Sequence, residues 1–268
     1  MIEFLLSPVL SLFSPRFYQK VLKSSLAKGL FYLVYLSLLG ALAFLLIILL
    51  KWMPTVDNFV AWLASEMPAI TFENGGLSTS VSQPHTITHP KFGKIIILNT
   101  TKEKLEPSEI REAFVYVTKH LIYVSNPLQK ETRIFDISEA RQQKNVPPGP
   151  HVLTGDLLKK AYDKIKPVFF GVLFGFTFLF IFLWKFVAAI LYSLVAVLLN
   201  LFRDEGFPYE KLLNVSIFSM SAVTLLQFLN AIVTSIHAPV PLWVALVLTT
   251  CYLGLSILVV SPPEKSPE

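Results

Sequence analysis

The chain contains one cysteine, Cys251, which lies inside an apolar stretch. No intrachain disulfide can form, so a folded domain must be stabilised by its own core rather than by the bridges that small secreted domains use. Charged residues are also scarce, at 15% of the chain, whereas soluble domains usually carry about 25%. Hydrophobic residues make up 53%. This composition predicts a membrane protein.

Sequence motifs of known chemistry are absent as well. No Gly-x-Ser-x-Gly, His-Glu-x-x-His or glycine-rich phosphate loop occurs. His85 and His89 have the spacing of two metal ligands on a helix, but the flanking prolines predict an extended segment, which holds them roughly 13 Å apart. The carboxylates from Glu103 to Glu112 alternate with basic residues, as on a solvated face. We therefore expect no enzymatic activity, no metal and no cofactor.

The positive charge has a location that argues against nucleic acid as a partner. The formal net charge is +5, and Arg16, Lys20, Lys23 and Lys28 lie just before the first long apolar run. Membrane anchors collect positive charge at this position. We expect residues 1–28 to form a cytoplasmic interfacial segment. It either lies on the lipid headgroups with its rings buried, or simply orients the first helix.

Long apolar stretches predict an α-helical membrane protein with about four transmembrane helices. Gly29 to Leu50 has no charged residue, and Val168 to Phe202 has only Lys185. Both exceed the roughly 20 residues that cross a hydrocarbon core about 30 Å thick. The expected spans are residues 29–50, 168–187, 212–233 and 242–260, followed by a disordered tail at 261–268.

The second apolar run is longer than one crossing requires. We expect its membrane helix to begin near Pro167 and to cross as far as Val187. Trp184 and Lys185 suit the far interface, where the lysine side chain would snorkel to the headgroups. Residues 188–202 would then continue along that interface or partly re-enter the membrane.

Residues 51–167 have the composition of a soluble domain, which predicts a small α+β domain inserted between the first two spans. Apolar residues at helical spacing predict a helix at 54–67, lying on the membrane or packed under the domain. Asn74–Gly75 predicts a hairpin turn within 70–81. Further elements are expected as a buried strand at 93–99, a strand at 133–137, and a short helical turn from Pro107 with strands up to Val124. A helix at 156–166 is expected to feed directly into the second span.

The expected sidedness follows from the first span. Basic residues near the spans are slightly more numerous on the side of the termini. Long translocated loops largely escape the charge rule, and the first helix usually dominates. We therefore expect both termini in the cytoplasm and the domain outside the cell (inner) membrane.

Small and polar residues recur inside two spans. In the third span four polar residues are separated by nearly whole helical turns and should share a narrow arc: Ser216, Gln227, Asn230 and Thr234. Such an arc is either hydrogen-bonded packing between helices or a polar track for a solute. In the second span, Gly171 and Gly175 would let another helix approach closely, within the chain or in a dimer.

Four short stretches carry a family resemblance. They are residues 14–21, 68–75, 95–101 and 209–216, with Asn99 where an aspartate is frequent. They resemble a family of uncharacterised bacterial membrane proteins, some of them labelled maltodextrin utilisation protein. The resemblance implies an inner-membrane protein with an extracytoplasmic domain and a membrane half similar to Yip-type proteins. It supplies no catalytic residues.

Two functions are consistent with these features. The first is a non-enzymatic accessory or scaffold protein, whose helices bind a partner complex or a second copy and whose domain binds a ligand or partner. The alternative is a component of a solute transport system, for a sugar as one example, with the polar track on the third span. A membrane hydrolase or transferase has the least support, because no catalytic motif is present.

Overall fold

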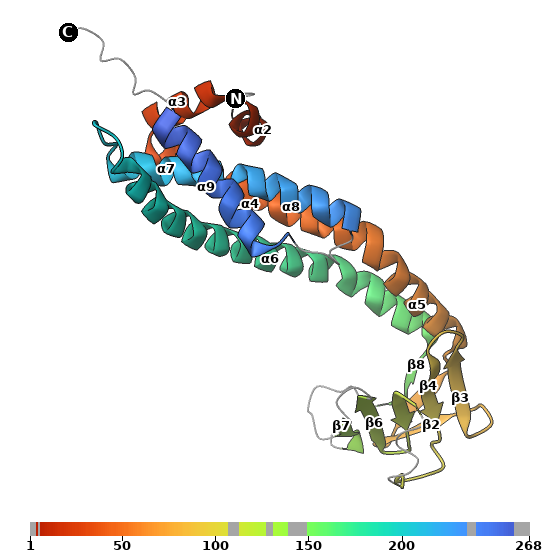
Figure 1. Ribbon diagram of the computed structural model, residues 1–268. Helices are drawn as coiled ribbons and strands as arrows, with labels where there is room; N and C mark the ends of the chain where they lie inside the picture. Colours follow the sequence, from red (N-terminus) through yellow and green to blue (C-terminus); the bar gives the residue numbers. More distant parts are fainter. Residues whose placement is uncertain are drawn as a thin grey trace. The chain divides into compact units, whose positions relative to one another are not determined.

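The computed structural model contains two compact units. The helical unit comprises Met1–Pro54 with Val168–Glu268, and the β-rich unit comprises Thr55–Pro167. Figure 1 shows the elements of both units in sequence colours. The structure describes residues 4, 6–106, 113–126, 131–138, 149–234 and 240–259. The predicted tail at 261–268 and the helical turn predicted from Pro107 lie outside these residues.

The first apolar run forms a helix that continues past the predicted span. Helix α4 (Leu26–Ile47) passes through a π-helical stretch, η1 (Ile48–Trp52), into α5 (Met53–Glu66) without a break. The Oγ of Ser25 accepts a hydrogen bond from the Lys28 N–H at 3.4 Å and caps the start of α4. The helix predicted at 54–67 is thus confirmed, and it is continuous with the first span.

Helix α6 (Gly155–Asn200) is a single helix of 46 residues. The helix start predicted near Pro167 is wrong, because Pro167 lies inside α6. The snorkelling predicted for Lys185 is also wrong. Its side chain is buried, and Nζ donates a hydrogen bond to Thr224 Oγ1 at 2.5 Å. Residues 188–200 stay in the same helix, with Ala189 and Ala196 buried in the helical core.

The third apolar run is interrupted. It forms α7 (Tyr209–Ser219) and α8 (Ser221–Thr234), with a turn at Met220 between them. The last run forms α9 (Leu242–Gly254) and a π-helical stretch, η4 (Leu255–Val259). Within the described residues, three helical stretches are long and apolar enough to cross a membrane: Leu26–Glu66, Gly155–Asn200 and Tyr209–Asn230. The stretch that corresponds to the fourth predicted span is shorter, at Leu242–Leu258.

The N-terminal segment packs on protein. It forms α2 (Ser7–Phe13) and the amphipathic α3 (Pro15–Lys23). The Phe17 ring lies 5.5 Å from that of Phe218 on α7, and Phe218 stacks on Tyr32 of α4 at 4.1 Å. Burial raises the pKa of the Tyr18 hydroxyl above its ordinary value. The rings of Phe17 and Tyr18 are therefore buried in the helical core.

The described residues of the β-rich unit form two sheets. The smaller has the order β2–β1–β8, and the larger has the order β3–β4–β5–β6–β7; among these strands β4 and β5 are parallel and the other neighbours are antiparallel. The strands are β1 (Ile70–Glu73), β2 (Gly76–Thr79), β3 (His85–His89), β4 (Gly93–Leu98), β5 (Val115–Val117), β6 (Leu121–Asn126), β7 (Glu131–Asp136) and β8 (His151–Leu153).

Local turn chemistry explains the first hairpin. Asn74 has φ 54° and Gly75 has φ 80°, and both residue types tolerate the positive φ that a two-residue hairpin turn requires. The predicted hairpin is confirmed, with Glu73 opposite Gly76. The extended conformation predicted around His85 and His89 is also confirmed, since both lie on β3.

Helix α5 packs against the β3–β4 hairpin, which agrees with the predicted alternative that this helix packs under the domain. The Trp62 ring meets that of His89 edge-on at 4.4 Å, and His89 stacks on Phe92 at 4.7 Å. Phe59 lies 5.7 Å from the same imidazole. These contacts fix the hairpin on the helix.

The same unit pairs α5 with the start of α6. Asp57 on α5 accepts hydrogen bonds from Lys166 Nζ at 2.7 and 2.9 Å and from the Tyr162 hydroxyl at 2.5 Å. Closer to the sheets, a Cβ at Gly155 would lie 1.8 Å from the backbone oxygen of Ala64. Position 155 therefore has no room for a side chain.

Candidate functional site

An apolar groove lies between the two sheets of the β-rich unit, and it is the larger of the two cavities described here. Its volume is about 400 Å³. The larger sheet contributes alternate residues of neighbouring strands, including Ile96, Leu98, Val115, Val117 and Ile122. These residues face one another in the strand register, because Ile96 pairs with Val115, and Val117 pairs with both Leu98 and Ile122. Alternation along each strand thus builds a continuous apolar wall.

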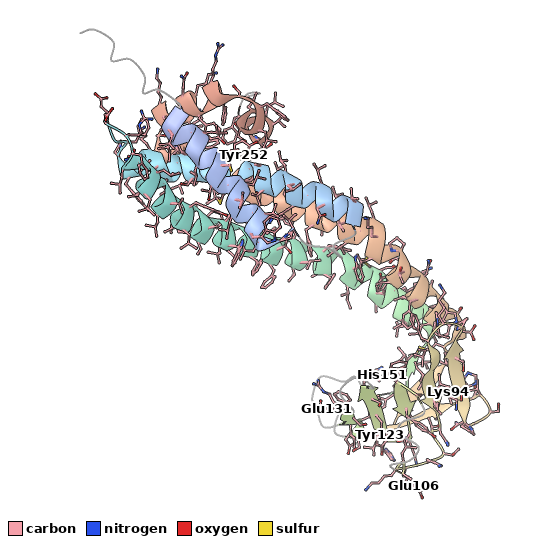
Figure 2. All side chains as sticks on the ribbon, in the orientation of Figure 1. Lys94, Glu106, Tyr123, Glu131, His151 and Tyr252 are labelled. Carbon is pink, nitrogen blue, oxygen red and sulfur yellow. The ribbon has the colours of Figure 1, made fainter. Side chains whose placement is uncertain are left out.

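The opposite face of the same sheet has its own apolar core. Ile97 lies between two groove residues in sequence, and it packs with Ala113, Tyr116 and Tyr123 (Figure 2 labels Tyr123). Strand β4 therefore buries apolar side chains on both faces. This explains its uninterrupted isoleucine run, which is typical of strands covered on both sides.

The smaller sheet forms the other wall of the groove. Ile70 and Phe72 of β1 line it together with Leu153 and His151 of β8, which are their partners in the register. His151 is labelled in Figure 2. Leu153 and Leu157 are 39% and 50% exposed, so the groove is open to solvent along β8 and the first turn of α6.

The groove has little capacity for polar recognition. Among the described residues that line it, His151 is the one with a polar side chain, and none is acidic, lysine or arginine. A polar solute placed there would lose its hydrogen bonds to water without replacement. The arrangement can hold an apolar molecule and shield it from water.

The helical unit buries polar side chains instead. Besides the Lys185–Thr224 bond, the Tyr32 hydroxyl and Ser221 Oγ are hydrogen-bonded at 2.6 Å. Asn214 Nδ2 donates to Ser24 Oγ at 2.7 Å. These contacts join α6 to α8, α4 to α8, and α7 to the segment between α3 and α4. Hydrogen bonds of this kind hold apolar helices together where water is absent.

Of the four residues predicted as one polar arc, Ser216 lies on α7 and the other three lie on α8. Ser216 is buried on α7 and donates within its own helix to the Leu212 oxygen at 2.8 Å. Gln227 is exposed and Asn230 is half-buried on α8. The side chain of Thr234 lies outside the described residues. Because the turn at Met220 separates Ser216 from the other positions, counting whole helical turns across it does not predict a shared face.

Gly171 and Gly175 have no close neighbour within the described chain. A Cβ at either position would meet nothing within 4 Å. Among the described residues, no other helix packs closely on these glycines. Packing within the chain and packing in a dimer both stay predictions.

The comparison with known proteins concerns nearly the whole chain. A family model described as "Protein of unknown function (DUF1189)" matches residues 9–257. The chain belongs to this family. The comparison with curated proteins gave no match, and the comparison with solved structures gave none.

The residues of the groove and of the buried polar contacts lie within the matched range. The family description names no substrate or activity. Within the described ranges, no group of three His, Cys, Asp or Glu residues could hold a metal ion.

Sequence reasoning missed two features of these sites. Lys185 was recognisable as the one charge in a long apolar run, but its partner Thr224 lies 39 residues away on another helix. The groove had a weaker signal. Its isoleucine-rich strand was predicted as buried, but nothing local showed that one of its faces would border a cavity.

Proposed function

We propose that this chain is a non-enzymatic accessory protein of the cell membrane whose β-rich unit binds an acyl chain of a lipid. The observation that carries the proposal is the groove of about 400 Å³ with apolar walls from both sheets. Small-molecule sites commonly measure about 300–1,000 Å³ and are mostly apolar. The family membership and the three membrane-compatible helices support the coarser part, a membrane protein.

The lining favours hydrocarbon over other apolar ligands that carry polar groups. Each buried methylene of an acyl chain contributes about 0.8 kcal/mol. A peptide strand would bring N–H and C=O groups that need partners, and these walls offer side chains without them. His151, on the solvent-open side of the groove, suits the polar end of such a lipid.

Photocrosslinking in native membranes tests the proposal with the full chain. A benzophenone amino acid replaces Leu153, which lines the groove and is 39% exposed. The matched control carries it at Ile134 on β7, which is 58% exposed and pairs with Tyr123 on the other face of the sheet. We expect lipid adducts by mass spectrometry at position 153 and none at 134. Equal adducts at both positions, no lipid adduct at 153, or a protein adduct there would contradict acyl-chain binding.

The proposed location is the outer side of the cell (inner) membrane for the β-rich unit and the cytoplasm for both termini. Basic residues before the first apolar run support it. The lone cysteine makes the test direct. With Cys251→Ser as background, Ser80→Cys should react with an impermeant maleimide on intact cells, and Ser266→Cys should not. The reverse pattern would place the β-rich unit in the cytoplasm.

A transport component is the second candidate function, and buried Lys185 favours it. Ionisable residues inside apolar helices frequently mark solute or proton pathways. If the helices conduct a sugar, proteoliposomes of the full chain should take up labelled maltotriose, and Lys185→Met should abolish uptake while the protein stays folded. Uptake no greater than in empty liposomes would exclude maltotriose transport by this chain alone.

A further inference from the structure

A second cavity lies in the helical unit, among α2, α3, the start of α4, and α7. Its volume is about 290 Å³. Two lysines and two serines line it: Lys20 on α3, Lys28 in the first turn of α4, Ser7 on α2, and Ser24 between α3 and α4. Basic and hydroxyl groups from four separate segments of the chain therefore meet at one cavity.

Both charged residues that line this cavity are basic. The sequence contains no aspartate or glutamate from residue 4 to residue 50. Lys211 of α7 also reaches the same place, since its Nζ donates to the Ser24 backbone oxygen at 2.8 Å. Lys28 lies at the N-terminal end of a 22-residue helix, where the helix dipole adds positive potential. A cavity of this kind attracts an anion.

The remaining walls are aromatic. Phe17 and Phe218 line the cavity and contact each other at 5.5 Å, and Phe4 lines it beside Tyr32 at 6.1 Å. A free inorganic anion gains nothing from such walls, because it loses water there without new hydrogen bonds. An amphiphile whose anionic group is joined to hydrocarbon matches both halves of the lining.

We propose that this cavity binds the phosphodiester headgroup of an anionic phospholipid. Lys20 and Lys28 bind the phosphate, and the phenylalanine rings cover the first carbons of the lipid. Basic pockets between membrane helices recognise anionic headgroups by the same chemistry. The site is separate from the groove of the β-rich unit, so either proposal can fail without the other.

The structure offers a matched pair of double variants for the test. Lys20→Gln with Lys28→Gln removes the two charges that line the cavity. Arg16→Gln with Lys23→Gln removes two exposed charges from the same N-terminal region, and neither residue lines the cavity. Both variants lower the net charge by two, so a difference between them reports position rather than total charge.

Native mass spectrometry of the full chain in detergent, titrated with phosphatidylglycerol and with phosphatidylcholine, measures the binding. We expect one phosphatidylglycerol per chain, bound more tightly than phosphatidylcholine. The Lys20/Lys28 variant should bind it about 30-fold more weakly, because each lysine near an anionic headgroup contributes about fivefold. The Arg16/Lys23 variant should bind as the unmodified chain does.

Three results would overturn the proposal. Equal losses in the two double variants would show non-specific attraction, and no loss in either would show that the cavity is not the site. Displacement of the lipid by inorganic phosphate would assign the site to a free anion. If the Lys20/Lys28 variant does not fold by circular dichroism, the single Gln variants replace it, each expected to bind about fivefold more weakly.

Discussion

The helical unit buries polar side chains within its apolar core and also exposes apolar ones, whereas the β-rich unit keeps an apolar groove open to solvent. Lys185, Thr224 and Asn214 are buried among the helices, while Val172 and Phe176 of α6 are more than half exposed. In the β-rich unit, Leu157 is exposed beside the groove instead. An apolar exterior suits a helix in lipid, whereas an open apolar groove on the β-rich unit suits the proposed ligand. The same kind of exposed residue therefore has a different meaning in each unit.

The largest effect is expected for Gly155→Ala, which disrupts the packing of α6 against α5 within the β-rich unit. The added Cβ would overlap the Ala64 backbone oxygen, which cannot rotate away. We expect a loss of about 3 kcal/mol in the free energy of unfolding, at the upper end of overpacking effects. Thermal unfolding of the full chain in detergent, followed by circular dichroism, measures it. Gly171→Ala is the control, because a Cβ there meets nothing within 4 Å and unfolding should be unchanged or slightly delayed. Equal unfolding temperatures for both variants would contradict the close contact.

The buried polar contacts of the helical unit come next. Thr224→Val removes the hydroxyl that accepts from Lys185 and leaves a buried ammonium without that partner. We expect destabilisation of about 2 kcal/mol, as for a buried polar group left unsatisfied. Adding Lys185→Met should restore most of the stability, because both partners are then apolar. A double variant as unstable as Thr224→Val alone would show that the pair does not interact in this way.

The smallest effect is expected at the α5–α6 ion pair. Asp57 and Lys166 are 40% and 29% exposed, so solvent and salt screen their attraction. Asp57→Asn should lower the unfolding temperature of the full chain less than either variant above, and the difference should shrink further in high salt. A large and salt-independent loss would mean that the carboxylate is needed for packing rather than for charge.

Features encoded by neighbouring residues could be predicted from the sequence. Asn74–Gly75 identified its hairpin because the turn requires positive φ at adjacent positions. The helix at 156–166 was predicted to feed into the second apolar run, and the structure shows one continuous helix there. In both cases the physical cause lies within a few residues of the signal.

Features that depend on distant contacts could not be predicted. The hydrogen-bond partner of Lys185 is Thr224 on another helix. Because the local sequence does not show this partner, Lys185 was predicted to lie at the far membrane interface. No glycine or proline marks the interruption at Met220 in the sequence. An uninterrupted third span was therefore predicted, in which the polar residues would share one arc. The groove brings β1 next to β8, which are separated by most of the domain sequence. Each of these outcomes is decided by packing rather than by local preference.

The pairing of Asp57 with Lys166 also has a consequence for modularity. These residues are 109 positions apart in sequence, yet their side chains are 2.7 Å apart. The polypeptide thus leaves and returns at nearly the same point, which is the arrangement that tolerates domain insertion best. The sheets between them could be excised and replaced by a short linker, or exchanged for another cassette with adjacent ends. The helical unit could then carry a different inserted domain.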